Sequence, residues 1–523
     1  MKFQPVIGLE IHIELNTRSK MFCSCPNDPD ERHANVNICP ICTAQPGCLP
    51  VINQEAVRKV IKTGLALNCQ IPENSKFDRK NYFYPDLPKG YQISQYDKPL
   101  CMEGFLSVNG KKVRITRVHL EEDTGRLIHV SEIGGRVDSG DWEEITKGPT
   151  EKMLEKYEQE AYSLVDFNRA GIPLMELVTE PDINSAKEAR EFAKELHLIS
   201  HYLDISDADM EKGQMRIEVN ISLISTNKNS RIFANEIRAN SRKLGTKVEI
   251  KNLNSFRVVE KSIDYEIQRQ AELLERGEKI IQETRGWDDK AGKTISQREK
   301  EEAHDYRYFP EPDLPPLRIT EEIINGIKAE IPELPQQRKE RLIREYGLDE
   351  KNVEVLVYKK DLGEYFEKIV SEFNPRLPKE ELSRLIKLAA NYLITDLQGI
   401  LQGKSLKGEG FLINPENFAE FVNLIHEGKI SSKLAKIILE EMFKTGADPS
   451  HIIEEKGLVQ ITSESEIEDI IKAVISENEK AVQDFKKGKG SSVQYLIGKT
   501  MEKTKGKASP KIVESILKKV LTD

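Results

Sequence analysis

The feature that most constrains the fold is a strict two-residue alternation near the start of the chain. In residues 7–15 every odd position is apolar, and Glu10, His12 and Glu14 lie at even positions. A period of two puts alternate side chains on opposite faces of a β-strand, with neighbours on one face about 7 Å apart. We therefore predict a strand with one apolar face and one face of ionisable groups.

Three other segments carry a similar pattern. Residues 215–223 alternate in the same way, residues 247–251 form a shorter version, and residues 113–123 end in His-Leu-Glu-Glu-Asp. A half-solvated sheet explains each strand singly. Four of them together collect carboxylates and an imidazole on one surface, where the negative charges would repel each other without a cation. Oxygen ligands with one histidine suit Mg²⁺, which often bridges protein carboxylates to substrate phosphates.

Cationic residues on the same predicted face point to the same chemistry. Arg216, Lys247 and Lys251 alternate with apolar residues in two of these strands. Arginine and lysine are common partners of phosphate oxygens. Together the acidic and basic residues outline a phosphoryl-transfer site.

Composition narrows the class of protein. The chain has 523 residues, which is too long for one hydrophobic core and indicates two or three domains. Hydrophobic residues make up 38% and charged residues 32%. No apolar run approaches the roughly 18 residues of a membrane span, and the first residues lack the apolar core of a signal peptide. Seven cysteines do not make a disulfide scaffold in a chain of this size. We expect a cytoplasmic protein with no membrane contact.

The spacing of apolar residues changes from strand-like to helical near residue 331. Strand-like alternation and Gly/Pro-rich loops dominate residues 1–330. The pattern then predicts a helical domain at residues 331–455 and a small helical tail at residues 456–523. The apolar residues at helical spacing include Leu362, Tyr365, Phe366, Ile369, Leu385, Ile386, Ala389, Leu434, Ile437, Ile438 and Met442, then Ile467, Ile471, Val474, Val513, Ile516 and Leu517 in the tail. Ser431 is a candidate N-cap. The overall expectation is an α+β fold.

The tail is basic although the whole chain has a net charge of −9. Ten lysines stand between Lys486 and Lys519, against two glutamates. Such a segment can bind phosphates through counterion release. It can equally be a solvated, lysine-rich helical surface, and charge alone leaves both interpretations open.

Two cysteine pairs are spaced as zinc ligands. Cys23-Ser-Cys25 is followed after thirteen residues by Cys39-Pro-Ile-Cys42, which suits a tetrahedral structural Zn²⁺, with His33 or Cys48 as a substitute ligand. A site closed by four thiolates leaves no position for water, so we expect it to fold the loop at residues 21–46. The remaining cysteines are predicted to be ordinary buried thiols: Cys48, Cys69 and Cys101.

Aromatic and basic residues interleave in residues 76–92. This loop contains four lysines or arginines and five aromatic residues. Aromatic faces and cations together suit contact with a nucleotide or RNA. A loop whose aromatic side chains simply pack together has the same composition, so the loop alone does not decide between the two.

Stretches along nearly the whole chain resemble one family, the B subunits of the aspartyl/glutamyl-tRNA amidotransferases. They occur in family order, at residues 6–12 (Val-Ile-Gly-Leu-Glu-Ile-His), 75–86, 119–123, 168–173, 251–256, 305–310 (Asp-Tyr-Arg-Tyr-Phe-Pro), 457–461 and 504–508. The resemblance implies a catalytic cradle built on a mainly antiparallel sheet, then an all-α domain with a YqeY-like tail that holds tRNA.

The activity implied by the resemblance is that of a carbon–nitrogen ligase with glutamine as amido donor. ATP phosphorylates the side-chain carboxylate of Glu-tRNA(Gln) or Asp-tRNA(Asn), and ammonia then displaces the phosphate. The family's A subunit would supply the ammonia from glutamine through a tunnel, and its small C subunit would complete a heterotrimer. The cognate non-discriminating synthetase would be a further partner.

The resemblance also assigns roles to individual residues. His12, Glu122 and Glu176 match the family's magnesium ligands, Glu10, Glu121 and Glu218 complete or flank that site, and Lys80 lies where the ammonia route reaches it. Many members have Asp at the position of Glu218. The four cysteines match a zinc site that some members have and others lack. The connection at residues 130–162 is too short for the inserted domain of the archaeal paralogue, which favours the bacterial type.

Two alternatives belong to other functional classes. A non-catalytic tRNA-binding scaffold would keep the tail and lose the chemistry, and the set of Glu10, His12, Glu122 and Glu176 argues against it. A stand-alone zinc hydrolase would need an open metal position, which four thiolate ligands do not leave.

Overall fold

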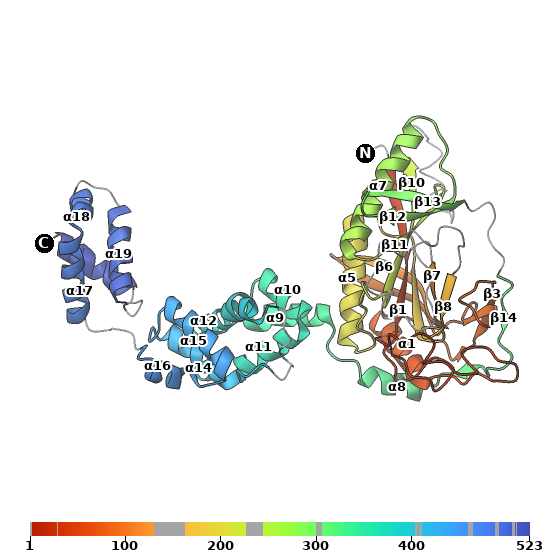
Figure 1. Cartoon of the computed structure of the whole chain (residues 1–523), viewed down its shortest axis with the longest axis horizontal. Helices are drawn as coiled ribbons and strands as arrows, with labels where there is room; N and C mark the ends of the chain where they lie inside the picture. Colours follow the sequence, from red (N-terminus) through yellow and green to blue (C-terminus); the bar gives the residue numbers. More distant parts are fainter. Residues whose placement is uncertain are drawn as a thin grey trace, which may run out of the picture. The chain divides into compact units, whose positions relative to one another are not determined.

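The computed structural model divides the chain into two compact units, residues 1–334 and residues 335–523 (Figure 1). The structure describes residues 3–299 apart from 29, 130–162 and 226–243, residues 306–458 apart from 403–405 and 407–409, and residues 464–522 apart from 487–490, 505–507 and 509. The connection at 130–162 and parts of the stretches at 305–310, 457–461 and 504–508 therefore lie outside the described residues. The further division of the second unit at residue 455 stays a prediction.

An eight-stranded sheet forms the centre of the first unit. Its order is β13-β12-β11-β10-β1-β9-β6-β5, and neighbouring strands are antiparallel except for the parallel pair β11–β12. The strands are β1 (Phe3–Glu14), β5 (Cys101–Val108), β6 (Lys111–Glu122), β9 (Pro173–Thr179), β10 (Met215–Ser225), β11 (Val248–Leu253), β12 (Glu283–Asp288) and β13 (Lys293–Glu299). All four strands predicted from alternation belong to this sheet, which confirms the mainly antiparallel architecture.

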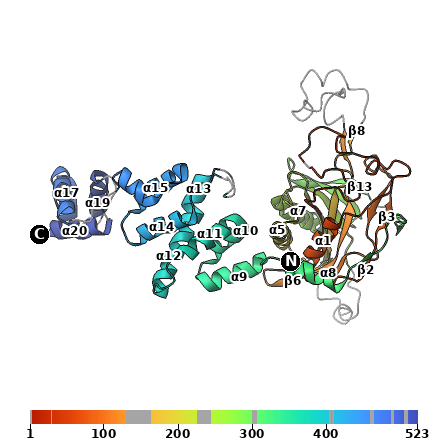
Figure 2. The same cartoon turned by 90° about the horizontal axis from the view of Figure 1, so that it is seen from below.

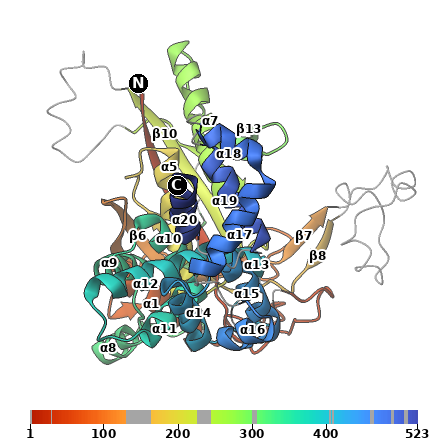
Figure 3. The ribbon, with the colours of Figure 1, turned by 90° about the vertical axis from the view of Figure 1, so that its left-hand side faces the viewer.

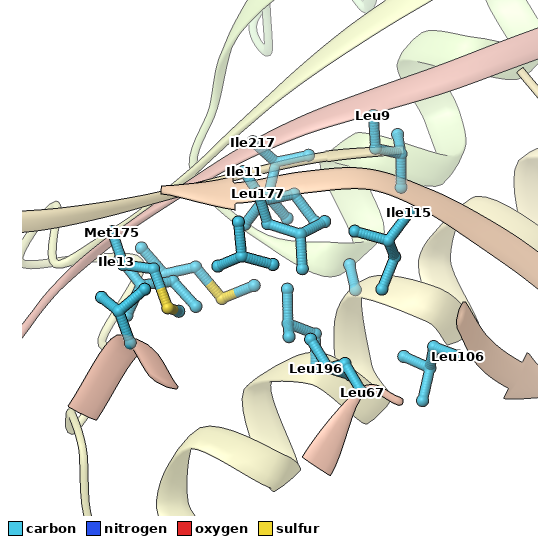
Figure 4. Packing of buried hydrophobic residues seen from close by; sticks show 14 of the residues in the cluster. Leu9, Ile11, Ile13, Leu67, Leu106, Ile115, Met175, Leu177, Leu196 and Ile217 are labelled. Atoms are coloured by element: carbon cyan, nitrogen blue, oxygen red, sulfur yellow. The ribbon is translucent and has the colours of Figure 1, made fainter. Parts of the chain in front are cut away.

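Helices cover the apolar face of the sheet. α5 (Ala186–Tyr202) and α7 (Phe256–Glu275) pack against each other along it (Figure 1), and α1 (Gln54–Ala66) packs on β5 and β6. Ser185 and Ser255 begin α5 and α7 as N-caps, each accepting a hydrogen bond from a backbone N–H in the first turn. Figure 4 shows side chains of the sheet facing those of the helical layer in one core. The odd-numbered residues of β1 from Ile7 to Ile13 are fully buried there, as predicted.

Smaller strand pairs complete the first unit. β3 (Asp78–Asn81) pairs with β4 (Tyr91–Ser94) and β14 (Phe309–Pro310), and β2 (Asn74–Ser75) pairs with β15 (Leu317–Arg318). β7 (Arg126–His129) and β8 (Ser163–Asp166) form a separate two-stranded ribbon, visible in Figure 3. α8 (Glu321–Ala329) packs on α1.

The regular elements in the described part of the second unit are all helices. Its elements are α9 (Pro335–Tyr346), α10 (Glu350–Tyr358), α11 (Lys360–Glu372), α12 (Lys379–Asn391), the π-helix η1 (Tyr392–Leu397), α13 (Gln398–Leu401), α14 (Pro415–His426), α15 (Ser432–Thr445), α16 (Pro449–Glu455), α17 (Glu464–Glu477), α18 (Glu479–Lys486), α19 (Ser491–Lys503) and α20 (Pro510–Thr522). Ser431 caps α15, as predicted. Ile437 is 40% exposed, so the prediction that it faces the core is wrong.

The tail has its own small core. α17, α19 and α20 lie together in Figure 2 and bury the predicted apolar positions of residues 467–517 between them. Lys499, Lys503 and Lys518 each form an ion pair with a glutamate on the tail surface. The described residues contain no helix that is both long and apolar enough to cross a membrane. An antiparallel sheet unit followed by a helical unit confirms the α+β class.

Candidate active site

The polar face of the central sheet carries the candidate site. On β1, His12 lies opposite Arg216 of β10 and opposite Glu176 of β9, and Glu176 lies opposite His119 of β6. Residues opposite each other in antiparallel strands project to the same face. Neighbouring strands thus bring carboxylates, imidazoles and a guanidinium to one place, as the alternation in the sequence predicts for β1, β6 and β10.

Glu176 is the centre of this group. Its Oε2 lies 3.3 Å from His12 Nε2 and 3.4 Å from His119 Nε2. His12 Nε2 also lies 3.8 Å from Glu121 Oε1 and 4.0 Å from Glu10 Oε1. The side chains of Glu121 and Glu176 are only 3% and 5% exposed, whereas that of Glu10 is 30% exposed. A ligand would therefore reach the group from the side of Glu10.

The donor atoms fit a divalent cation. Two overlapping sets, Glu10–His12–Glu176 and His119–Glu121–Glu176, each have ligand atoms within 4.8 Å of one another. Burial and the nearby carboxylates of Glu176 and Glu218 raise the pKa of Glu10 to about 7, which indicates crowded negative charge. A cation between the carboxylates would remove this repulsion, and oxygen donors with an imidazole suit Mg²⁺.

Both imidazoles respond to the carboxylates around them. Burial by itself lowers the pKa of His12 and His119, but Glu176 and Glu121 outweigh it, so the pKa of His12 is raised and that of His119 rises to about 9. His119 is fully buried, and its Nδ1 has no hydrogen-bond partner within the described part of the chain. In the absence of a metal, the protonated His119 therefore balances part of the charge of the carboxylates.

Lys80 belongs to the same group. Its Nζ lies 5.4 Å from the ring centre of Tyr306 and 5.8 Å from that of Tyr82. Burial by itself lowers the pKa of Lys80, but the charge of Glu121 and its neighbours outweighs this and raises the pKa above its usual range. Ser94 Oγ on β4 donates to Glu121 Oε2 at 2.9 Å, which attaches the small sheet carrying Lys80 to the polar face.

Glu122 is not brought into this group. It follows Glu121 on β6, and successive side chains of a strand point to opposite faces. Its carboxylate accepts hydrogen bonds from Lys89 Nζ at 2.5 Å and from the backbone N–H of Ile93 at 3.0 Å. In this structure Glu121, and not Glu122, lies beside His12, and the role of Glu122 as a metal ligand stays a prediction.

The three predicted phosphate contacts have different surroundings. Arg216 Nη2 donates to Asp123 Oδ2 at 2.8 Å, and Lys251 Nζ donates to Glu218 Oε1 at 3.0 Å. Glu218 is thus held by a lysine at the edge of the group. Lys247 is exposed just before β11, and extending the register puts it four residues along β10 from Glu218, about 13 Å away. The structure does not bring Lys247 to the group.

Arg117 and His119 are site residues that the sequence reasoning missed. Arg117 Nη2 lies 3.5 Å from Glu176 Oε1, and its buried Nε has no partner among the described residues. The available signal was spacing, because residues 117, 119 and 121 share one face of β6.

Glu14 and Asp123 form a second buried pair beside the group. Burial, together with the charge of Asp123, raises the pKa of Glu14 to about 8. Burial opposes ionisation of Asp123 as well, but the guanidinium groups of Arg216 and Arg169 lower its pKa to about 2. At neutral pH a protonated Glu14 therefore shares a hydrogen bond with an ionised Asp123.

The four predicted cysteine ligands meet in space. The sulfur atoms of Cys23, Cys25, Cys39 and Cys42 all lie within 4.8 Å of one another, and all four are free thiols. The N–H of Cys39 donates to Cys42 Sγ at 3.0 Å, which favours a thiolate there. The geometry and the donor set fit a closed zinc site. Cys69 and Cys101 are buried as predicted, whereas Cys48 is exposed, contrary to the prediction.

Hydrogen bonds join the cysteine loop to the segment after β8. The N–H of Asn37 donates to Asn168 Oδ1 at 2.9 Å, and Asn168 Nδ2 donates to the carbonyl of His33 at 2.7 Å. The next residue, Arg169, donates to the carbonyl of Thr124 at 3.1 Å. The loop therefore supports the chain segment that lies against the end of β6.

The fold and the site together define a catalytic protein of the GatB type. Residues 5–325 match the family described as the GatB/GatE catalytic domain, and residues 364–521 match the GatB domain. The chain belongs to the family of B subunits of the aspartyl/glutamyl-tRNA(Asn/Gln) amidotransferases, whose members are components of tRNA-dependent amidotransferases. This confirms the resemblance inferred from the sequence.

Curated relatives match over the whole chain. The B subunit from Thermotoga maritima is 46% identical over 525 residues, which cover 100% of this chain and 99% of the relative. The B subunit from Persephonella marina is 47% identical, with 100% of both chains covered. The B subunit from Caldicellulosiruptor bescii is 46% identical, with 100% of this chain and 99% of the relative covered.

Proposed function

We propose that this chain binds misacylated tRNA and activates its side-chain carboxylate with ATP, within a glutamine-dependent amidotransferase. The relatives are named as the B subunit of an aspartyl/glutamyl-tRNA(Asn/Gln) amidotransferase, so an A subunit that supplies ammonia from glutamine and a C subunit are its expected partners. One observation carries the proposal. Carboxylates and an imidazole from β1, β6 and β9 lie close enough together to bind a single cation, and Lys80 lies beside them.

The proposed chemistry solves a leaving-group problem. A carboxylate is a poor electrophile because oxide is a very poor leaving group. In the first step, a carboxylate oxygen of Glu-tRNA(Gln) or Asp-tRNA(Asn) attacks the γ-phosphorus of ATP, and ADP leaves. In the second step, ammonia attacks the acyl phosphate, phosphate leaves with the bonding electron pair, and loss of a proton gives the amide. The sequence of steps requires no protein nucleophile.

The metal would be held by Glu10, His12, Glu121 and Glu176, with the ligand atoms nearest to one another on His12 and Glu176. Mg²⁺ bound there supplies charge neutralisation and orientation for the transferring phosphoryl group. Glu10 has the most exposed side chain of these four residues, so a substrate phosphate would approach the metal from the side of Glu10.

The surrounding side chains position the reactants. Arg117 and His119 hold Glu176 through contacts of 3.5 and 3.4 Å, His119 from the buried side and Arg117 with a partly exposed side chain. Arg216 and Lys251 each bind a carboxylate in this structure, and an incoming phosphate can compete for such a cation. Lys80 is a half-buried cation whose pKa the charge of Glu121 raises, at the side where ammonia is expected to arrive.

Three further parts of the proposal concern the rest of the molecule. The four cysteines bind a structural Zn²⁺, supported by their closed geometry. The helical tail contacts the body of the tRNA, supported by its excess of lysine. The complex acts in the cytoplasm, where translation takes place.

A test of the proposal uses the chain purified with its A and C partners. Wild-type complex should form ADP and an acyl phosphate from ATP and Glu-tRNA only when Mg²⁺ is present, and Glu176→Gln should reduce this rate by at least a hundredfold. Glu211→Gln, which changes an exposed carboxylate, is the matched control. A wild-type complex that binds tRNA but never consumes ATP with it would favour a non-catalytic scaffold.

A further inference from the structure

Two stacked tyrosines lie next to the candidate active site. The rings of Tyr96 and Tyr308 are 4.2 Å apart at their centroids and 9° from parallel. Tyr96 follows β4 and Tyr308 precedes β14, so two segments distant in the sequence form the pair. Tyr96 is 58% exposed. Because Tyr308 covers one face of its ring, the exposed part of Tyr96 is a flat aromatic surface open to a ligand.

The pair is attached to the reacting group by short connections. Tyr96 is two residues after Ser94, whose hydroxyl donates to Glu121 at 2.9 Å. On the other side, the ring of Tyr308 lies 6.2 Å from that of Tyr306, which in turn lies 5.4 Å from Lys80 Nζ. A ligand on the exposed ring would therefore be a near neighbour of the carboxylates.

The surface is held rigidly. The N–H of Tyr96 donates to Asp78 Oδ2 at 3.1 Å. Arg79 donates to both carboxylate oxygens of the buried Glu311, at 2.7 and 2.8 Å, which binds β3 to the segment that follows β14. Because these contacts exist without a ligand, little ordering is needed when one binds.

We propose that Tyr96, backed by Tyr308, is the stacking platform for the adenine base of the 3′-terminal nucleotide of the tRNA. The inference rests on the proposed function and adds the place where the acceptor end binds. Bases stack on aromatic side chains whatever their sequence, because every base offers a π-face. An acceptor end shared by different tRNAs needs this kind of contact.

The direction of phosphoryl transfer selects this adenine over the adenine of ATP. The attacking and leaving oxygens lie roughly in line on opposite sides of the phosphorus. Arg216 and Lys251 bind carboxylates outside the group around Glu176, so they suit the triphosphate, and they belong to β10 and β11, on one side of Glu176 in the sheet. Arg117 on β6 contacts Glu176 itself. The platform is attached to β6, on the other side. The esterified carboxylate, and the nucleotide that carries it, therefore approach over Tyr96.

The test measures the affinity of the assembled enzyme for two uncharged tRNAs, one intact and one whose 3′-terminal residue lacks its base. Removing the base should weaken binding to the wild type roughly tenfold, the effect of one stacked base. Tyr96→Leu should weaken binding of intact tRNA by the same factor, and removal of the base should then have no further effect. Tyr96→Phe should behave as the wild type. Tyr358→Leu, which removes a tyrosine of similar exposure from α10, is the control.

Other outcomes would overturn the inference. If Tyr96→Leu weakens ATP binding and leaves tRNA binding unchanged, the platform holds the adenine of ATP. If removal of the base has no effect on the wild type, the pair is only packed structure, and this result needs no variant to fold. Failure of the proposed function is separate: the wild-type complex would then form no acyl phosphate, whichever way the base affects binding.

Discussion

Glu121 and Glu122 are consecutive residues of β6, yet their carboxylates lie on different faces of the strand. Glu121 lies 3.8 Å from His12 in the polar group, whereas Glu122 binds Lys89 and the backbone N–H of Ile93. The two are chemically identical, so composition cannot separate them. Their roles follow from the strand period of two and from which face of the sheet carries His12 and Glu176.

Variants at these two positions should have opposite effects. Glu121→Gln is expected to weaken binding of Mn²⁺, a spectroscopic substitute for Mg²⁺, at least tenfold, because one ligand loses its charge. Glu122→Gln should leave that affinity within about twofold but lower the free energy of unfolding by about 3 kcal/mol, because Lys89 keeps a buried charge without its partner. Electron paramagnetic resonance titration and urea unfolding measure the two quantities. A metal affinity that depends on Glu122 instead would identify Glu122 as the ligand.

His119 should matter most when no metal is bound. It offsets the charges of Glu121 and Glu176 at 3.8 and 3.4 Å, so His119→Gln should lower the free energy of unfolding of the metal-free protein by about 1–3 kcal/mol. Saturating Mg²⁺ should recover part of this loss, because the cation balances the same carboxylates. Urea unfolding with and without Mg²⁺ tests this, with His451→Gln on an exposed surface of α16 as control. Equal losses under both conditions would contradict the explanation.

Glu14 should make stability depend on pH in a defined window. Its pKa is about 8 in the folded chain against an ordinary value of 4.5, so between these values the folded state keeps a proton that the unfolded state releases. The free energy of unfolding therefore falls as pH rises from 4.5 to 8, by up to about 1.4 kcal/mol per pH unit from this group. Below 4.5 both states are protonated and the contribution is constant.

Glu14→Gln should remove that dependence, because the amide imitates the protonated acid. Relative to the wild type, the variant should gain stability as pH rises, reaching about 4 kcal/mol near pH 8. Unfolding curves at several pH values measure the difference, and the exposed Glu211→Gln should show none. A difference that shrinks with rising pH would mean that Glu14 is ionised in the folded chain.

Loss of one cysteine should release the zinc and loosen a defined segment. We expect about one zinc ion per chain in the wild type and almost none in Cys39→Ser. Because Asn37 and Asn168 join the cysteine loop to the residues after β8, hydrogen exchange should rise at residues 165–171. Cys48→Ser, at an exposed thiol, should change neither quantity. Exchange confined to the loop itself would show that the segment is held by other contacts.

The strands and helices with a clear period were predictable from the sequence. β1 and β10 alternate cleanly because one face is buried and the other is polar, and Ser431 begins α15 as its capping chemistry predicts. β9 shows no such alternation, because its residues are buried on both faces and Glu176 is the only charged residue in the strand. The role of Glu176 in the site was predicted from the family resemblance alone.

The sequence by itself determined the faces: which side chains share one side of each strand, which cysteines can close a zinc site, and where helices replace strands. These follow from local periods and spacings, which act over a few residues. Only the tertiary structure decided which strands are neighbours and in which register they pair. The register between β1, β9 and β6 brings Glu176 to His12 and His119 and leaves Glu122 and Lys247 outside the group. Strand order and register depend on packing between residues far apart in the chain, and no local pattern encodes them.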